Sequence, residues 1–295
     1  MAITAAMVKD LRERTGAGMM ECKKALTEVA GDLDAAIELL RKKGAASADK
    51  KSGRIAAEGV ISAYLSDDGK VATLVEVNSE TDFVAKADNF IAYAENVAVC
   101  IANSNPADVD ELLQQPLTDS GETVEQARHS LIAKLGENIG IRRFTTYSTD
   151  GDSVLSCYLH GTRIGVLVEV SGGREDLGRD LAMHIAALKP MCLDEEGVSE
   201  QVLAKEREIY TAQANDSGKP ANIVEKIVEG RVQKYLKEIT LLGQAFVKDT
   251  DQSVAELLNS EKAQVHRFAR YEVGEGIERK SEDFVAEVMA QAKVQ

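Results

Sequence analysis

The segment Val71-Ala-Thr-Leu-Val-Glu-Val77 occurs a second time in this chain, as Ile164-Gly-Val-Leu-Val-Glu-Val170. Its alternating apolar pattern predicts a strand with one buried face. A further apolar run precedes each copy across a short glycine-containing turn; these runs are Val60-Ile-Ser-Ala-Tyr-Leu65 and Val154-Leu-Ser-Cys-Tyr-Leu159. Two strands joined in this way predict a β-hairpin, and the hairpin is present twice.

The repetition continues beyond the hairpins. A helical pattern follows each one, over residues 87–102 and 176–188. A third strand is also duplicated, as Arg143-Phe-Thr-Thr-Tyr147 and Arg267-Phe-Ala-Arg-Tyr271. Internal similarity of this kind indicates two copies of one structural unit. We therefore predict an α+β fold with two repeated subdomains, each a three-stranded antiparallel sheet covered by helices.

The second copy is interrupted by an insertion. Two helical patterns, over residues 199–214 and 221–236, flank the turn Gly218-Lys-Pro220. They predict an antiparallel helical hairpin whose arms of about 16 residues reach roughly 24 Å. The apolar stripes are narrow and the flanks are charged. This pattern favours a protruding hairpin over one packed flat on the sheet.

The N-terminal part is helical. Residues 4–43 show three short helical patterns, the first two separated by Thr15-Gly-Ala-Gly18. In the second pattern Met19 falls on the apolar stripe, whereas Met20 lies off it. Met20 is either an adaptable contact residue or an ordinary exposed side chain. A module of about 40 residues is near the lower limit for independent folding, so it suits docking better than catalysis.

Two segments border these units. Residues 44–56 are small, polar and basic, and predict a linker or a frayed helical extension. Ser281 followed by Phe284 and Val288 predicts a capped C-terminal helix. We assign residues 1–54 to the three-helix module and linker, 55–148 to the first repeat, 149–194 and 238–277 to the second repeat, 195–237 to the inserted hairpin and 278–295 to the C-terminal helix.

The charge balance argues against nucleic acid as the main partner. The 295 residues include 35 basic and 49 acidic side chains, a net charge of −14. Binding a phosphate backbone requires a cationic face, so nucleic acid is not expected as the main partner. The first 54 residues hold 11 basic and 8 acidic side chains. That balance makes no cationic stripe, and RNA binding there is a weak alternative.

The cysteines and the absence of long apolar runs indicate the compartment. Four cysteines without CxxC spacing predict reduced thiols rather than disulfides or a zinc site. The N-terminus has no apolar signal core, and no run approaches 18 apolar residues. We therefore expect a cytoplasmic protein that does not span a membrane.

Motifs for catalysis are also missing from the sequence. It contains no GxxxxGK[ST] phosphate loop, no HExxH metal motif and no GxSxG nucleophile motif. The four histidines have no partners at metal-ligand spacing, and His184 suits a core or rim position. We expect no cofactor, no metal site, no direct nucleotide binding and no covalent chemistry.

One turn differs between the two copies. Thr81-Asp-Phe-Val84 connects a strand to a helix, where a scaffold often presents groups to a partner. The structural interpretation is that Asp82 caps the following helix and Phe83 packs beneath it. The second copy has Ser171-Gly-Gly-Arg-Glu-Asp-Leu177 at this place, without Phe. The scaffold therefore does not require Phe83, which favours a functional role.

Several motifs together indicate a family. The chain resembles the bacterial elongation factor Ts family, whose members are nucleotide exchange factors of the translational GTPase elongation factor Tu. The matching motifs follow the family order along nearly the whole chain, with no recognised motif at residues 103–121. They are Leu11-Arg-Glu-Arg-Thr-Gly-Ala-Gly-Met-Met20, Glu80-Thr-Asp-Phe-Val-Ala85, His160-Gly-Thr-Arg-Ile-Gly165, Ser217-Gly-Lys-Pro220 with Glu225-Lys-Ile-Val-Glu-Gly-Arg231, and Arg270-Tyr-Glu-Val-Gly-Glu-Gly-Ile277.

The resemblance implies specific contacts. The three-helix module resembles a ubiquitin-associated domain and would dock on the GTPase domain of elongation factor Tu, with its contact residues at Arg12, Met19 and Met20. His160 would contact the partner's β-barrel domains. The helical hairpin would be a coiled-coil or dimerisation element, and the C-terminal helix a further docking element.

The same resemblance assigns a role to the differing turn. It implies that Thr81, Asp82, Phe83 and Val84 reach the partner's magnesium and nucleotide, so that GDP leaves and GTP can bind. The alternative is an adaptor that docks through its three-helix module without promoting exchange. A dimer or a 2:2 assembly with elongation factor Tu is left open.

Overall fold

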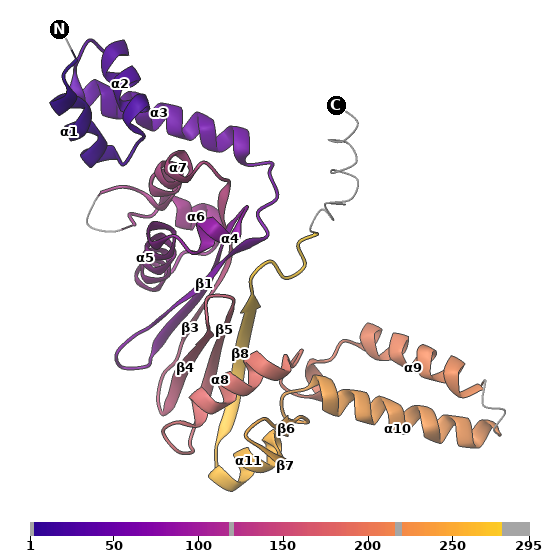
Figure 1. Ribbon diagram of the computed structural model, residues 1–295. Helices are drawn as coiled ribbons and strands as arrows, with labels where there is room; N and C mark the ends of the chain where they lie inside the picture. The colour runs from indigo at the N-terminus through magenta and orange to yellow at the C-terminus, as the bar shows by residue number, and fades with distance from the viewer. Residues whose placement is uncertain (1–2, 118–120, 216–219, 279–295) are drawn as a thin grey trace, which may run out of the picture.

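The computed structural model describes residues 3–117, 121–215 and 220–278. It combines helices with antiparallel sheets, which confirms the predicted α+β class. Figure 1 shows the N-terminal helices at one end, the sheets in the middle and a helical hairpin projecting from the opposite end. The predicted C-terminal helix at residues 278–295 lies outside the described residues from residue 279 onward.

Three helices form the N-terminal module: α1 (Ala5–Thr15), α2 (Met19–Glu28) and α3 (Leu33–Lys51). Thr4 caps α1 and Asp32 caps α3 through side-chain oxygens that accept backbone N–H groups. The core of the module is small, with Leu11, Cys22 and Leu26 fully buried. Because a core of this size provides little stability, the module also depends on packing against the rest of the protein.

The placement of Met19 on the core stripe of α2 is wrong. Its side chain is 60% exposed, and that of Met20 is 63% exposed. Met19 is the first residue of α2, preceded by Gly18 at the N-cap, and the stripe that packs on α1 and α3 begins one turn later at Cys22. The first residue of a helix can remain exposed when the neighbouring helices cover only the turns that follow it.

The segment expected to be a linker or a helical extension is mostly helix. The last turns of α3 pack against α7 (Val124–Leu135) of the first repeat. A Cβ on Gly44 would lie 3.7 Å from the carbonyl oxygen of His129 and 3.8 Å from the Cβ of Ala133. The two helices therefore approach closely, and this contact joins the module to the sheet domain.

The first repeat forms as predicted. Its sheet has the order β1-β2-β3, and both pairs are antiparallel. Its elements are β1 (Glu58–Leu65), β2 (Val71–Ser79), α4 (Asp82–Ala85), α5 (Asp88–Ser104), α6 (Val109–Gln114), α7 and β3 (Ile139–Ser148). In its described residues, the connection at 103–121 thus contains the short helix α6.

The second repeat has the same plan, with the sheet order β4-β5-β8. Its elements are β4 (Ser153–His160), β5 (Ile164–Ser171), α8 (Leu177–Leu188), a 3-10 turn (Glu195–Gly197), a two-stranded ribbon of β6 (Ala245–Phe246) and β7 (Asp249–Ser253), α11 (Val254–Glu261) and β8 (Gln264–Glu272). The ribbon and α11 were not expected, because they are too short to show periodicity.

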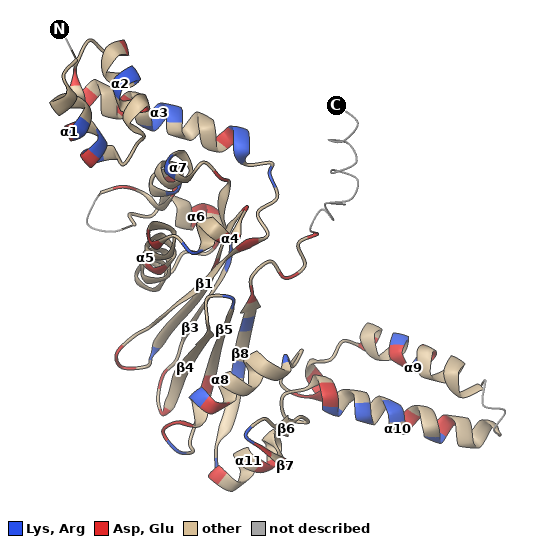
Figure 2. Ribbon diagram, in the orientation of Figure 1, with Lys and Arg blue, Asp and Glu red and all other residues tan. Residues whose placement is uncertain are grey.

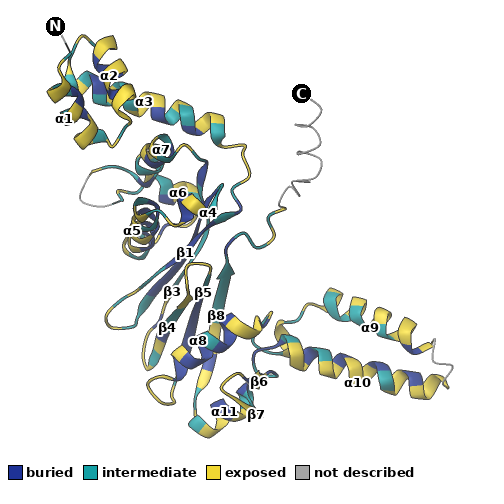
Figure 3. Ribbon diagram, in the orientation of Figure 1, coloured by how far each residue is buried: buried dark blue, intermediate teal, exposed yellow. Residues whose placement is uncertain are grey.

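Each sheet uses its two faces differently. Alternate residues of β2, including Val75 and Val77, pack on the helices of their own repeat, whereas Ala72 and Leu74 face the other repeat. In β5, Val166 and Val168 pack on α8, and Leu167 faces the first repeat. The period of two therefore builds two helix-covered cores and a third, smaller core between the sheets. Figure 3 shows buried residues along the strands and on the inner faces of the helices.

The inserted hairpin consists of α9 (Glu200–Asn215) and α10 (Ala221–Ile239). It stands away from the sheets, which confirms the protruding arrangement (Figure 1). Val224, Val228 and Val232 form the buried stripe of α10 against α9. Figure 2 shows acidic and basic residues interleaved along α10, so its outer face is well hydrated.

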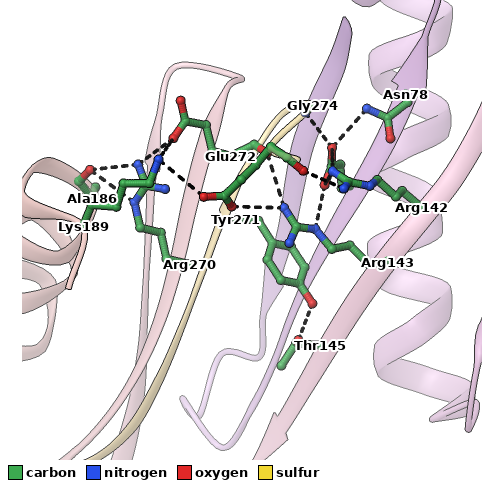
Figure 4. A network of polar contacts seen from close by, with 12 residues as sticks. Asn78, Arg142, Arg143, Thr145, Ala186, Lys189, Arg270, Tyr271, Glu272 and Gly274 are labelled. Atoms are coloured by element: carbon green, nitrogen blue, oxygen red, sulfur yellow. Dashed lines mark hydrogen bonds and ion pairs between the residues drawn. The ribbon is translucent and has the colours of Figure 1, made fainter. Parts of the chain in front are cut away.

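A buried carboxylate lies where the two repeats meet. Glu76 of β2 is fully buried and accepts hydrogen bonds from Arg142 at 3.2 Å, Arg143 at 2.7 Å and the Gly274 amide at 2.8 Å (Figure 4). Asn78 donates a further bond to it at 3.1 Å. Burial raises the pKa of Glu76, but these donors outweigh it and leave the pKa below its usual value.

Candidate functional site

The turn after β2 is organised by Thr81. Its hydroxyl oxygen accepts the Val84 N–H at 3.4 Å and so caps α4. The Ser79 hydroxyl donates to the Thr81 carbonyl at 3.0 Å. The prediction that Asp82 caps the following helix is wrong, because Asp82 is already the first residue of α4 and Ala87 occupies the N-cap of α5.

Phe83 projects into solvent. Its side chain is 83% exposed, whereas the next residue, Val84, is only 7% exposed and belongs to the core of the first repeat. The interpretation that Phe83 packs beneath the helix is therefore wrong. Val84 anchors the short helix α4, and the turn presents an aromatic ring beyond the end of the sheet. An exposed aromatic ring on a fixed backbone suits contact with a partner.

Asp82 lies beside Phe83 and forms an ion pair with Lys86, with its oxygen 2.6 Å from the ammonium nitrogen. This hydrogen bond lowers the pKa of Asp82, so the carboxylate is charged at neutral pH. Both side chains are well exposed and the pair is open to water. A surface pair of this kind is weak, so Asp82 is free to exchange Lys86 for a group of a partner.

Two carboxylates, one on each side, join this turn to the loop that precedes β3. The Glu137 carboxylate accepts the Thr81 N–H at 2.9 Å and the Thr81 hydroxyl at 2.6 Å. Glu80 accepts the Asn138 N–H at 2.6 Å. The sequence did not predict roles for Glu137 and Asn138, because a single Gly-Glu-Asn turn before a strand matches no known functional motif.

The other residues expected at an interface lie on separate elements. Arg12 is exposed on α1, and Met19 and Met20 are exposed on α2. His160 is exposed at the end of β4, where its Nδ1 lies 3.0 Å from the Tyr158 hydroxyl. The structure therefore does not gather them into one pocket with Phe83. They would act together only across a large contact surface.

Among the described residues, no group of three His, Cys, Asp or Glu side chains could hold a metal ion. Two surface hollows, of about 490 and 320 Å³, are lined by residues other than 81–84. His184 is a core residue, as its position on the helix suggested, and accepts the Val247 N–H at 3.1 Å. Within residues 3–117, 121–215 and 220–278, no helix combines the length and apolar character needed to cross a bilayer.

Comparison with known proteins identifies the family. The family model described as "Elongation factor TS" matches residues 80–275. Elongation factor Ts from Methylococcus capsulatus is 61% identical over 293 residues, covering 99% of both chains. The proteins of the same name from Thioalkalivibrio sulfidiphilus and Alkalilimnicola ehrlichii are 59% and 57% identical over the same length, again covering 99% of both chains. The chain belongs to the elongation factor Ts family.

Proposed function

We propose that this protein is a guanine nucleotide exchange factor of translation elongation. It binds elongation factor Tu in its GDP form in the cytoplasm, disturbs the magnesium and phosphate site of that GTPase and promotes GDP release, so that GTP can bind. Membership of the elongation factor Ts family supports the exchange role. The observation that carries the proposed mechanism is the 83% exposure of Phe83 on a turn that its own repeat holds rigidly.

The energetics follow from linkage. An exchange factor must bind the empty GTPase more tightly than the loaded one, and factor and nucleotide then weaken each other's binding equally. A thousandfold loosening of GDP corresponds to about 4 kcal/mol of coupling. Burying the exposed Phe83 ring between partner helices would provide about 1.5–3 kcal/mol of this. Broad docking through Arg12, Met19, Met20 and His160 would supply the remainder.

Asp82 adds an electrostatic contribution. Its carboxylate lies next to Phe83 and is held charged by Lys86. When Phe83 is inserted near the partner's magnesium ion, this negative charge would compete for the groups that orient the ion's water shell. The factor itself makes and breaks no covalent bond in this scheme.

The test is the release of a fluorescent GDP analogue from elongation factor Tu at saturating factor. The Phe83→Ala variant should slow release by roughly 10- to 100-fold, the loss expected for about 1.5–3 kcal/mol of aromatic burial. Adding Asp82→Ala should slow it further. Lys134→Ala, an exposed substitution at the end of α7, serves as the control. If the Phe83/Asp82 double variant accelerated GDP release as much as the wild-type protein does, the mechanism would be refuted. If the wild-type protein bound elongation factor Tu without accelerating GDP release, the adaptor function would be favoured.

A further inference from the structure

We propose that Glu137 is a positioning residue that fixes the direction of Phe83, and that the loop carrying it acts as a clamp on the exchange turn. The inference rests on the proposed exchange function. Glu137 acts on Phe83 indirectly. Its influence passes through Thr81, to which both of its carboxylate oxygens are bonded.

The clamp is reciprocal. Glu137 accepts the backbone N–H of Thr81, and Glu80, the neighbour of Thr81, accepts the backbone N–H of Asn138, the neighbour of Glu137. Two adjacent residues of one loop are therefore cross-linked to two adjacent residues of the other. Hydrogen bonds from N–H groups to carboxylates are stronger than neutral ones, which makes this a stiff junction.

The far side of the clamp is itself fixed. Gly136 ends α7 in a left-handed conformation with φ of 82°, and β3 begins at Ile139, directly after Asn138. The Asn138 side-chain amide donates to the carbonyl of Arg54 at 2.8 Å. Glu137 is thus held between a helix end and a strand start, on a backbone that cannot easily follow a shift of Thr81.

Phe83 depends on this external support. Its exposed ring makes little contribution to holding its own backbone, and α4 has only four residues. The Thr81 hydroxyl links clamp and turn, since it donates to Glu137 and accepts the Val84 N–H. Without Glu137, Phe83 would sample several directions, and the partner would have to order it on binding. Preorganisation of this kind lowers the cost of ordering Phe83 when it inserts to release GDP, a step that follows docking on the GDP-bound partner.

The second repeat has a related carboxylate contact at the corresponding turn, without the aromatic residue and without the second, reciprocal bond of the clamp. Glu261, at the end of α11 and just before β8, accepts the Arg174 N–H at 3.1 Å and the Arg174 Nε–H at 3.0 Å. Arg174 lies in the turn that corresponds to the one at Thr81. The fold therefore uses a carboxylate at this place twice, and only the first copy uses it to support Phe83. Glu261 is for that reason a matched control.

The experiment compares Glu137→Ala, Glu137→Gln and Glu261→Gln in the full chain. Release of a fluorescent GDP analogue from elongation factor Tu is measured at saturating factor, together with the affinity for the GDP-bound partner and the urea midpoint of each variant. Glu137→Ala removes both hydrogen bonds to Thr81 and should slow release roughly tenfold or more. Its affinity should remain within about twofold of wild type, because docking residues elsewhere are untouched.

The controls separate positioning from general stability. Glu261→Gln should lose stability comparable to Glu137→Gln yet keep the wild-type release rate. Glu137→Ala should add nothing to Phe83→Ala, because it acts through the same side chain. Wild-type release by both Glu137 variants, with slow release by Phe83→Ala, would overturn the clamp but keep the exchange mechanism. Equal slowing by Glu261→Gln would also overturn the clamp, and wild-type release by Phe83→Ala would overturn both proposals.

Discussion

The guanidinium carbon of Arg143 lies 4.2 Å from the ring centre of Tyr271, and each residue comes from a different repeat. The reverse pair exists as well, because Arg267 lies 4.2 Å from the ring centre of Tyr147. Arg143 and Arg267 occupy corresponding positions in the two third strands, as do Tyr147 and Tyr271. Each repeat therefore places its arginine on the tyrosine of the other, and the two halves are joined by a symmetric exchange of cation–π contacts.

Replacing Tyr271 by Leu should lower the free energy of unfolding by about 1–2 kcal/mol, because the cation–π contact is lost while an apolar side chain remains. Tyr271→Phe keeps the ring and loses only the bond between its hydroxyl and that of Thr145. Its effect should be about half as large. Urea unfolding of both variants measures the difference, and a larger loss in Tyr271→Phe than in Tyr271→Leu would contradict the cation–π assignment.

Glu76 should make the fold sensitive to acid. Its pKa is lowered in the folded state, so its contribution to stability is fully present above its ordinary value of 4.5 and is lost as the pH falls through the lower folded value. Glu76→Gln should lower the free energy of unfolding by about 3 kcal/mol at pH 7, since Arg142 and Arg143 lose a buried partner.

Urea unfolding of wild type and Glu76→Gln at pH 7, 4.5 and 3.5 checks this, and the difference between them should shrink as the pH falls. The matched control is Glu13→Gln, which removes an exposed carboxylate paired with Lys9. This substitution should change the free energy of unfolding by no more than about 0.5 kcal/mol. A difference for Glu76→Gln that does not change with pH would be evidence against this account.

His184 should contribute a second pH dependence nearer neutrality. Burial lowers its pKa below 6.5, although the bond to Gln244 opposes this. The unfolded chain therefore binds a proton at a higher pH than the folded chain, and stability falls as the pH drops below 6.5. Thermal unfolding of wild type between pH 7.5 and 5.5 should show this decline. His184→Gln should be less stable at pH 7.5 but show a flatter pH profile, and an unchanged slope would refute the role of His184.

Gly165 allows the two sheets to approach. A Cβ at this position would lie 2.5 Å from the Cγ2 of Ile61 and 2.6 Å from the Cδ1 of Leu74, both in the first repeat. Gly165→Ala should therefore lower the free energy of unfolding by about 1–3 kcal/mol through overpacking. Gly140→Ala is the matched control in a strand, because a Cβ at Gly140 would meet no described atom within 4 Å. If the two substitutions had equal effects on thermal unfolding, close packing at Gly165 would be disproved.

Substitutions at Phe83 and at its neighbour Val84 should affect stability very differently. Phe83→Ala should change the free energy of unfolding by no more than about 0.5 kcal/mol, because the ring is exposed. Val84→Ala should lower it by about 1–2 kcal/mol, because Val84 is packed in the core. Urea midpoints measure both. A strongly destabilised Phe83→Ala would mean that the ring supports the fold.

The candidate site could be predicted in part from the sequence. Comparison of the two copies singled out Phe83 as a residue that the scaffold does not need, and its exposure agrees with that reasoning. Glu137 could not be found in this way, because its bond to Thr81 spans 56 positions of the chain. The prediction that Met19 is buried is wrong because helical periodicity shows on which side of the helix a residue lies, but not whether a neighbouring helix extends far enough to cover it.

The sequence by itself determined the repeated units and the hairpin within each, since alternation with a period of two and glycine turns are local properties of the chain. Only the tertiary structure decided how the repeats meet. Arg143 and Glu76 are already neighbours across β2 and β3, but the contact of Arg143 with Tyr271 and the bond from the Gly274 N–H to Glu76 form only when the sheets pack face to face. Contacts between distant residues depend on the geometry of that packing, which no short pattern in the chain encodes.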